Sequence, residues 1–172
     1  MEDILVLFCE DLSAVATLRR KNNPTELRLP TLPSNSAQDY SDQIAIDVAK
    51  RCLGMSKENV HLVSYYVYFT YRVFVATTST EHISHANDEI LDCGWMMMNM
   101  HINNLHSYVI YSSRRQLLWA GHVTLRSSSI WFPSYNEQMT FRDLVNLMEK
   151  EYPHSVILNA TPQKTGWHVN YI

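Results

Sequence analysis

Glycine, cysteine and long apolar runs are all scarce in this sequence, and each scarcity excludes a class of function. Four glycines among 172 residues cannot build the glycine-rich loop that holds phosphates in many nucleotide-binding proteins. Three cysteines, Cys9, Cys52 and Cys93, are an odd number without Cys-x-x-Cys spacing, which indicates reduced thiols in an intracellular protein, cytoplasmic or nuclear. The apolar run at residues 4–8 is far too short to cross a membrane and follows no basic leader, so we expect neither a membrane span nor a secretory signal.

Charge is sparse as well. Charged residues make up 18% of the chain, the formal net charge is −3 and the pI is near 6.2, which argues against a strongly basic, nonspecific nucleic-acid binder. A local basic patch still fits within this balance. Hydrophobic residues make up 46%, so the composition is globular, and the length predicts a single domain over residues 1–172.

Apolar patterning and turn residues predict alternating strands and helices. The predicted strands cover residues 3–9, 15–20, 60–77 (two strands joined around 69–72) and 155–160. The predicted helices cover residues 39–55, ended by Gly54, and 141–152, capped by Thr140. We expect loops at residues 21–26 and 161–172; residues 107–111 fit a strand or a helix, and residues 114–122 favour a helix.

The order of these elements resembles the Nudix family of nucleoside-diphosphate-linked hydrolases over roughly residues 3–105. A Leu-Pro turn, LRLPTLP at 27–33, precedes the helix DYSDQIAIDVAKRCLGM at 39–55, and the acidic segment NDEILDCGW follows at 87–95. The resemblance implies an α/β/α sandwich with a mixed sheet. It also implies a helix that, in the family, carries glutamates holding magnesium.

Alignment on Gly54 shows which residues stand at the positions of the family motif. The aligned residues are Pro33, Asp39, Asp47, Val48, Arg51, Cys52 and Gly54. The motif glutamates are thereby replaced by an aliphatic residue, a cation and a thiol, which offer none of the hard oxygen ligands that Mg²⁺ requires. At helical spacing these three residues share a face, and Ile44, Val48 and Cys52 continue an apolar stripe that we expect to pack on the sheet. The resemblance therefore implies no catalytic residue, no metal and no cofactor.

A cluster of basic and aromatic residues offers a candidate site for an anionic ligand or single-stranded RNA. Its members are Arg19, Arg20, Arg28, Arg51, Tyr65, Tyr68 and Arg72. Aromatic rings beside arginine can stack on bases, whereas the alternative is that the tyrosines belong to the core and the arginines to solvated loops. Both interpretations stay open.

A methionine- and tryptophan-rich region offers a candidate protein interface. Its members are Met96, Met97, Met98, Trp119, Trp131 and Phe132. Methionine adapts to irregular surfaces and tryptophan is enriched at binding hot spots, although a packed core explains part of the pattern.

The function expected from these features is that of a catalytically inactive, Nudix-like binding or scaffold subunit of a protein or ribonucleoprotein complex. We expect the partner to be a protein, either a different protein or a second copy of this chain. We expect no association with a membrane. One alternative is a sequence-specific RNA-binding protein. Another is an atypical metal-dependent nucleotide or RNA-cap pyrophosphohydrolase that uses acids such as Asp39, Glu89 and Asp92.

Overall fold

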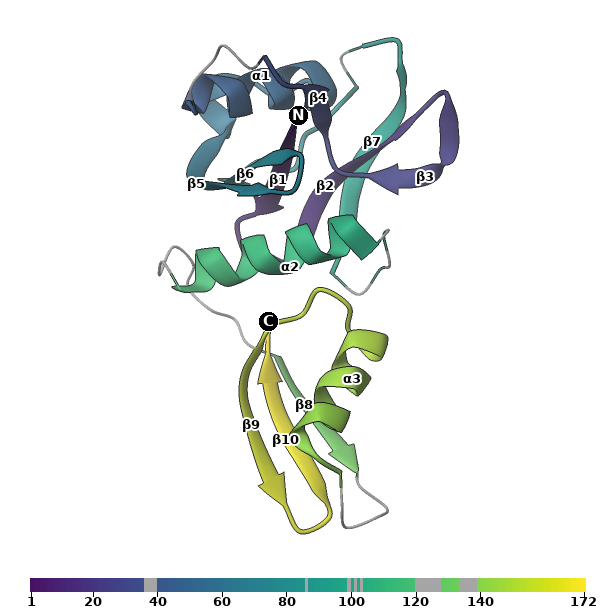
Figure 1. Ribbon diagram of the computed structural model, residues 1–172, viewed down its shortest axis with the longest axis vertical. Helices are drawn as coiled ribbons and strands as arrows, with labels where there is room; N and C mark the ends of the chain where they lie inside the picture. Colours follow the sequence, from purple (N-terminus) through teal and green to yellow (C-terminus); the bar gives the residue numbers. More distant parts are fainter. Residues whose placement is uncertain are drawn as a thin grey trace.

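The computed structural model describes residues 1–35, 40–85, 87–98, 100, 102, 104–119, 128–133 and 139–172. Within these residues two sheets form, separated by one helix (Figure 1). The first contains β1 (Glu2–Cys9), β2 (Ala14–Arg20), β3 (Asn23–Arg28), β4 (Thr31–Pro33), β5 (His61–Tyr68), β6 (Tyr71–Thr78) and β7 (Ile90–Met97). The second contains β8 (Ser128–Pro133), β9 (Ile157–Gln163) and β10 (Gly166–Tyr171). The helices are α1 (Asp42–Leu53), the short 3₁₀ helix η1 (Lys57–Asn59), α2 (Asn104–Trp119) and α3 (Phe141–Glu151).

The larger sheet is mixed and is centred on β1. This strand pairs in parallel with β6 and antiparallel with β2 and β4, while the order across the sheet is β3-β2-β1-β6-β5 with β7 on β2. Helices cover both faces, so β1 is buried on both sides, which explains its continuous apolar sequence.

Alternate side chains of β1 feed two hydrophobic cores. Leu5 and Leu7 point toward α1 and pack with its buried stripe, whereas Ile4, Val6 and Phe8 point toward α2. The prediction of an α/β fold with a mixed sheet is therefore confirmed, and the larger sheet lies between α1 and α2 as the sandwich requires.

The C-terminal part forms a smaller unit of its own. Strands β8, β10 and β9 lie side by side in that order, and α3 packs on one face through Leu144 and Met148 (Figure 1). The N-terminus of α3 carries a reciprocal cap, in which Thr140 Oγ1 accepts from the Asp143 N–H and the Asp143 carboxylate accepts from the Thr140 N–H. The predicted helix at 141–152 is confirmed, while the single-domain organisation stays a prediction.

Arg114 of α2 joins the two units from a fully buried position. Its Nη1 donates to the main-chain oxygens of His154, at 2.6 Å, and Ile172, at 2.8 Å, and its Nη2 donates to the Leu12 oxygen at 3.1 Å. Burial lowers the pKa of this guanidinium to about 10. The C-terminal strand and the β1–β2 turn are thus both fixed to one side chain.

Three local predictions differ from the structure, and one open choice is settled. The helix predicted from residue 39 begins at Asp42, after an N-cap at Ser41, and residues 36–39 lie outside the described part of the chain. Residues 23–28 form β3 instead of a loop, because β2 pairs with them despite their polar sequence. The open choice at 107–111 is settled as helix, and the expected loose tail contains β10. Within the described residues, no helix is long and apolar enough to cross a membrane.

Candidate functional site

The C-terminal end of α1 is fixed by Gly54. This residue has φ of +60°, and a Cβ built on it would come within 2.7 Å of the backbone oxygen of Ser84. The Ser84 N–H in turn donates to the Leu53 oxygen at 2.9 Å. A side chain is excluded there by both backbone conformation and space, so glycine is required to end the helix against the 79–85 segment.

The three residues that the predicted alignment on Gly54 sets against the family glutamates do not share one environment. Val48 and Cys52 are fully buried in the core between α1 and the sheet, while Arg51 is exposed. The expectation that Ile44, Val48 and Cys52 pack on the sheet is confirmed, but the shared face predicted to include Arg51 is wrong. Arg51 lies about 100° around the helix from Cys52, at the margin of the stripe.

Mg²⁺ does not fit this helix. An aliphatic side chain and a thiol inside an apolar core supply no hard oxygen ligand, and burial raises the pKa of the Cys52 thiol and keeps it protonated. Pro33 ends β4, and Asp47 lies half-buried, accepting from the Gln43 amide at 2.7 Å. Asp39 lies outside the described residues.

A small polar pocket lies beside Arg51. It has a volume of about 370 Å³ and is lined by Arg51, Asn87, Asp88 and Glu89. The Arg20 guanidinium lies 3.8 Å from the Glu89 carboxylate and donates to the Thr31 oxygen at 2.7 Å. Arg20 and Arg51 therefore lie in one neighbourhood, next to two acids.

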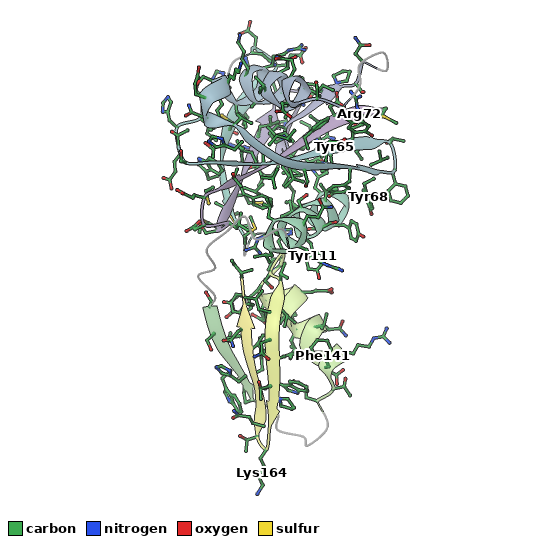
Figure 2. The ribbon with its side chains drawn as sticks, turned by 90° about the vertical axis from the view of Figure 1, so that its left-hand side faces the viewer. Tyr65, Tyr68, Arg72, Tyr111, Phe141 and Lys164 are labelled. Atoms are coloured by element: carbon green, nitrogen blue, oxygen red, sulfur yellow. The ribbon has the colours of Figure 1, made fainter. Side chains whose placement is uncertain are left out.

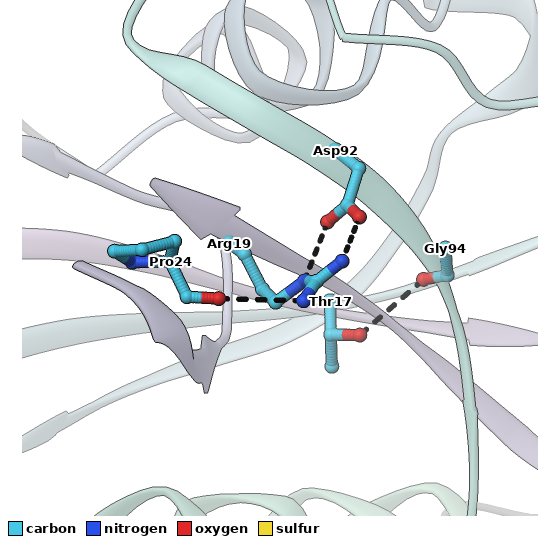
Figure 3. Close-up of polar contacts among 5 residues, drawn as sticks. All are labelled: Thr17, Arg19, Pro24, Asp92 and Gly94. Carbon is cyan, nitrogen blue, oxygen red and sulfur yellow. Dashed lines mark hydrogen bonds and ion pairs between the residues drawn. The ribbon is translucent and has the colours of Figure 1, made fainter. Parts of the chain in front are cut away.

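Arg19 and Asp92 neutralise each other on the neighbouring strands β2 and β7 (Figure 3). The guanidinium makes two contacts with the carboxylate, including Nε to Oδ1 at 2.9 Å, and a third bond from Nη1 to the Pro24 oxygen. These hydrogen bonds lower the pKa of Asp92. Thr17, two residue pairs along, donates to the Gly94 oxygen at 3.4 Å. Neither Arg19 nor Asp92 is a free charge for a ligand.

The proposed aromatic and basic groove is not assembled as one surface. Tyr65 stacks on Tyr40 at 4.6 Å on the α1 side of β5, whereas Tyr68 packs on the α2 side. Strands β1 and β6 separate both tyrosines from Arg19 and Arg20 on β2. The structure brings Arg20 of β2 close to Arg51, whereas Arg19 is held by Asp92 and both tyrosines lie on β5 at the far edge.

Arg72 and Arg28 also have structural surroundings. Arg72 is buried and forms two bonds with the Asp3 carboxylate, at 2.5 and 2.9 Å, while its guanidinium lies 5.4 Å from the Tyr40 ring. Arg28 is half-buried on β3, near the His106 ring. A ligand role for Arg72 would require this buried ion pair to break.

The methionine and tryptophan candidates are divided between core and surface. Met96 and Phe132 are buried in two different cores, so neither can contact a partner without unfolding. Met98 is half-buried against the α2 core, and Met97 and Trp131 are exposed on different sheets. The side chain of Trp119 lies outside the described part of the structure.

One large cavity was not predicted from the sequence. It has a volume of about 910 Å³ and lies between α2, α3 and β9; we call it the α2–α3 cleft. Its walls include Tyr108 and Tyr111 of α2, Phe141 and Val145 of α3 and Leu158 of β9. Figure 2 shows Tyr111 and Phe141 one above the other on the same side of the molecule.

An aromatic surface leads into this cleft from the β5–β6 hairpin. The Tyr68 ring stacks on Tyr108 at 4.8 Å, and Phe69 at the hairpin tip meets Tyr68 edge-on at 4.7 Å. Phe69 is 75% exposed and has φ of +52°, an uncommon conformation for a bulky residue. Of the predicted ligand residues, Tyr68 is therefore the one connected to the cleft.

The fold is identified by comparison with solved structures. The Nudix domain of Shewanella oneidensis NrtR, solved with ADP-ribose, matches with a TM-score of 0.51 and 16% identity over 67% of this chain and 86% of that chain. A C. elegans Ap4A hydrolase matches with a TM-score of 0.52 and 13% identity over 69% of this chain and 97% of that chain. A Nudix-family hydrolase from Clostridium perfringens matches with a TM-score of 0.51 and 14% identity over 69% of this chain and 96% of that chain. No protein-family model and no curated protein matches the sequence. The chain therefore has the Nudix fold, and at these identities the similarity defines the fold alone.

Proposed function

We propose that this chain is a catalytically inactive Nudix-fold protein that acts as a binding or scaffold subunit for a protein partner. One observation carries the proposal: Val48 and Cys52, at two of the three positions aligned with the metal-binding glutamates, are buried in the hydrophobic core. Both side chains point away from solvent, so no change of rotamer would present a ligand for a metal ion at these two positions. The loss of ligands is thereby built into the packing of α1.

The remaining acids support the same conclusion. Asp92 is held by Arg19, and Glu89 is exposed and lies beside Arg20. Among the described residues, no group of three or more His, Cys, Asp or Glu side chains is arranged to hold a metal ion. The alternative of an atypical hydrolase built on Asp39, Glu89 and Asp92 has no described constellation in its favour.

The α2–α3 cleft is the surface that we assign to the partner. Large apolar residues at its rim are exposed, including Tyr108, Phe141 and Leu158, and such concave apolar surfaces mark interaction sites. The alternative RNA-binding function is less well supported, because two strands separate Arg19 and Arg20 from Tyr65 and Tyr68, and Arg72, on the strand beside these tyrosines, is buried in its ion pair with Asp3.

Affinity purification of the tagged native chain, with and without nuclease, tests the proposal. The expected result is a stoichiometric protein partner that resists nuclease, is lost with Phe141→Ala and is retained with Leu91→Ala, a change at an exposed apolar residue of β7 outside the cleft. Recovery of RNA alone would show that the partner is RNA and not a protein. Hydrolysis of ADP-ribose or Ap4A, the compounds in the names of two matched structures, would overturn the inactive state.

A further inference from the structure

The apolar face of helix α3 has two margins with different neighbours, and we call the margin formed by Phe141, Val145 and Tyr152 the second stripe. Leu144 and Met148 are buried against the three-stranded sheet. Phe141, Val145 and Tyr152 follow each other at spacings of four and seven and line the α2–α3 cleft, with Phe141 54% exposed. The second stripe therefore has no complete cover within the described chain.

The opposite wall of the cleft is the edge of a sheet. Among the described residues β9 pairs only with β10, and residues 157–160 of β9 line the cleft. Its outer N–H and C=O groups have no strand partner there, and an unpaired edge of this kind is a template for an added strand. The register with β10 shifts so that Leu158 is an extra, unpaired residue, 39% exposed, and Pro162 has no N–H to offer further along. The edge is thus open over a short length.

The charges of the residues that line the cleft indicate which class of ligand it can bind. Of its lining residues, Glu149 is the one acidic side chain and none is lysine or arginine. A phosphate group would meet a carboxylate and no fixed cation, so nucleotides and RNA are disfavoured. Aromatic rings and one carboxylate instead suit an apolar ligand with a positive charge.

From the open edge, the second stripe and the charge, we propose that the α2–α3 cleft binds an extended peptide segment of a partner protein, added antiparallel or parallel to the first half of β9. The stripe from Phe141 to Tyr152 spans about 16 Å at about 1.5 Å per residue, which an extended chain covers with about five residues. Alternate apolar side chains of the peptide lie against Phe141 and Val145, and a lysine or arginine faces Glu149. This inference rests on the proposed function and names the chemistry of its partner.

Selection from a phage-displayed library of random linear peptides on the full chain tests the proposal. We expect enriched peptides with alternating apolar residues and a basic residue. Fluorescence polarisation with the most enriched peptide should show at least tenfold weaker binding to Leu158→Glu and Phe141→Ala. Leu91→Glu on β7 is the matched control, because Leu91 is 41% exposed and Leu158 39%. It should bind as the wild type does.

Two further measurements separate the outcomes. Hydrogen exchange with bound peptide should slow at residues 157–160 and be unchanged at 61–68 of β5, the exposed edge of the other sheet. Glu149→Lys should weaken the binding of a basic peptide a few-fold. Replacing the peptide's basic residue by glutamate should restore its binding to the Glu149→Lys variant. Two results would overturn this inference. One is a set of peptides that bind equally well to Leu158→Glu and Leu91→Glu. The other is a single-stranded oligonucleotide that binds the wild type and loses affinity for Phe141→Ala. A nuclease-resistant partner insensitive to Leu158→Glu would overturn it and leave the proposed function standing.

Discussion

Introducing glutamate at Val48 should destabilise the fold strongly. Val48 is 1% exposed, so the substitution removes a buried apolar group, worth about 1.5–3 kcal/mol, and puts a carboxyl group in the α1 core. Burial raises the pKa of such a group by roughly 3 units and keeps it protonated, which costs about 4 kcal/mol of folding stability at neutral pH. The sum approaches the whole stability of an ordinary domain, about 5–15 kcal/mol.

Urea unfolding followed by circular dichroism measures this loss. The variant should lose further stability as the pH rises from 4.3 to 7, because the glutamate of the unfolded state releases its proton first. Val67→Glu, at a valine 55% exposed on β5, and Arg51→Glu, on the exposed margin of α1, are the controls and should change stability by about 1 kcal/mol or less. A Val48→Glu protein as stable as Val67→Glu, or one stabilised by millimolar Mg²⁺, would refute the reasoning.

Three other changes follow from buried or capping groups. Arg114→Met should lower the free energy of unfolding by about 3–5 kcal/mol, since three buried oxygens lose their donor, whereas Arg115→Met at its exposed neighbour should have a small effect; equal effects in urea unfolding would contradict the role of Arg114. Burial lowers the pKa of His106 from 6.5 to about 4, so stability present above pH 6.5 should fall as the pH drops toward 4. About 2 kcal/mol of this loss at pH 5 should disappear in His106→Asn, and an unchanged pH dependence would contradict it. Thr140→Ala should cost about 1 kcal/mol in thermal unfolding, and no loss would show that the cap is unimportant.

Sequence patterns predicted the elements whose signals are local. The apolar run of β1, the aromatic pair β5 and β6, and the glycine that ends α1 each carry their own residues and are found where the patterns put them. β3 and β10 were missed because pairing, of β3 with β2 and of β10 with β8 and β9, rather than their own composition makes them strands.

The candidate sites were harder to predict, because they depend on which side chains meet in space. Arg19 and Arg20 on β2 are separated by β1 and β6 from Tyr65 and Tyr68 on β5, which the sequence alone does not show. The α2–α3 cleft combines residues 107–111, 141–152 and 157–160, and no single stretch announces it. The one local signal was the width of the apolar face on the helix at 141–152, which continues from Leu144 and Met148 to Phe141 and Val145.

We propose that the chain keeps a Nudix fold without metal-dependent hydrolysis. The most direct test is turnover of ADP-ribose and Ap4A by the purified chain with Mg²⁺ or Mn²⁺, against an EDTA control and with Glu89→Gln and Asp92→Asn measured in parallel. We predict rates equal to those without protein in every arm. Hydrolysis by the wild type that EDTA abolishes and either substitution reduces would contradict the account.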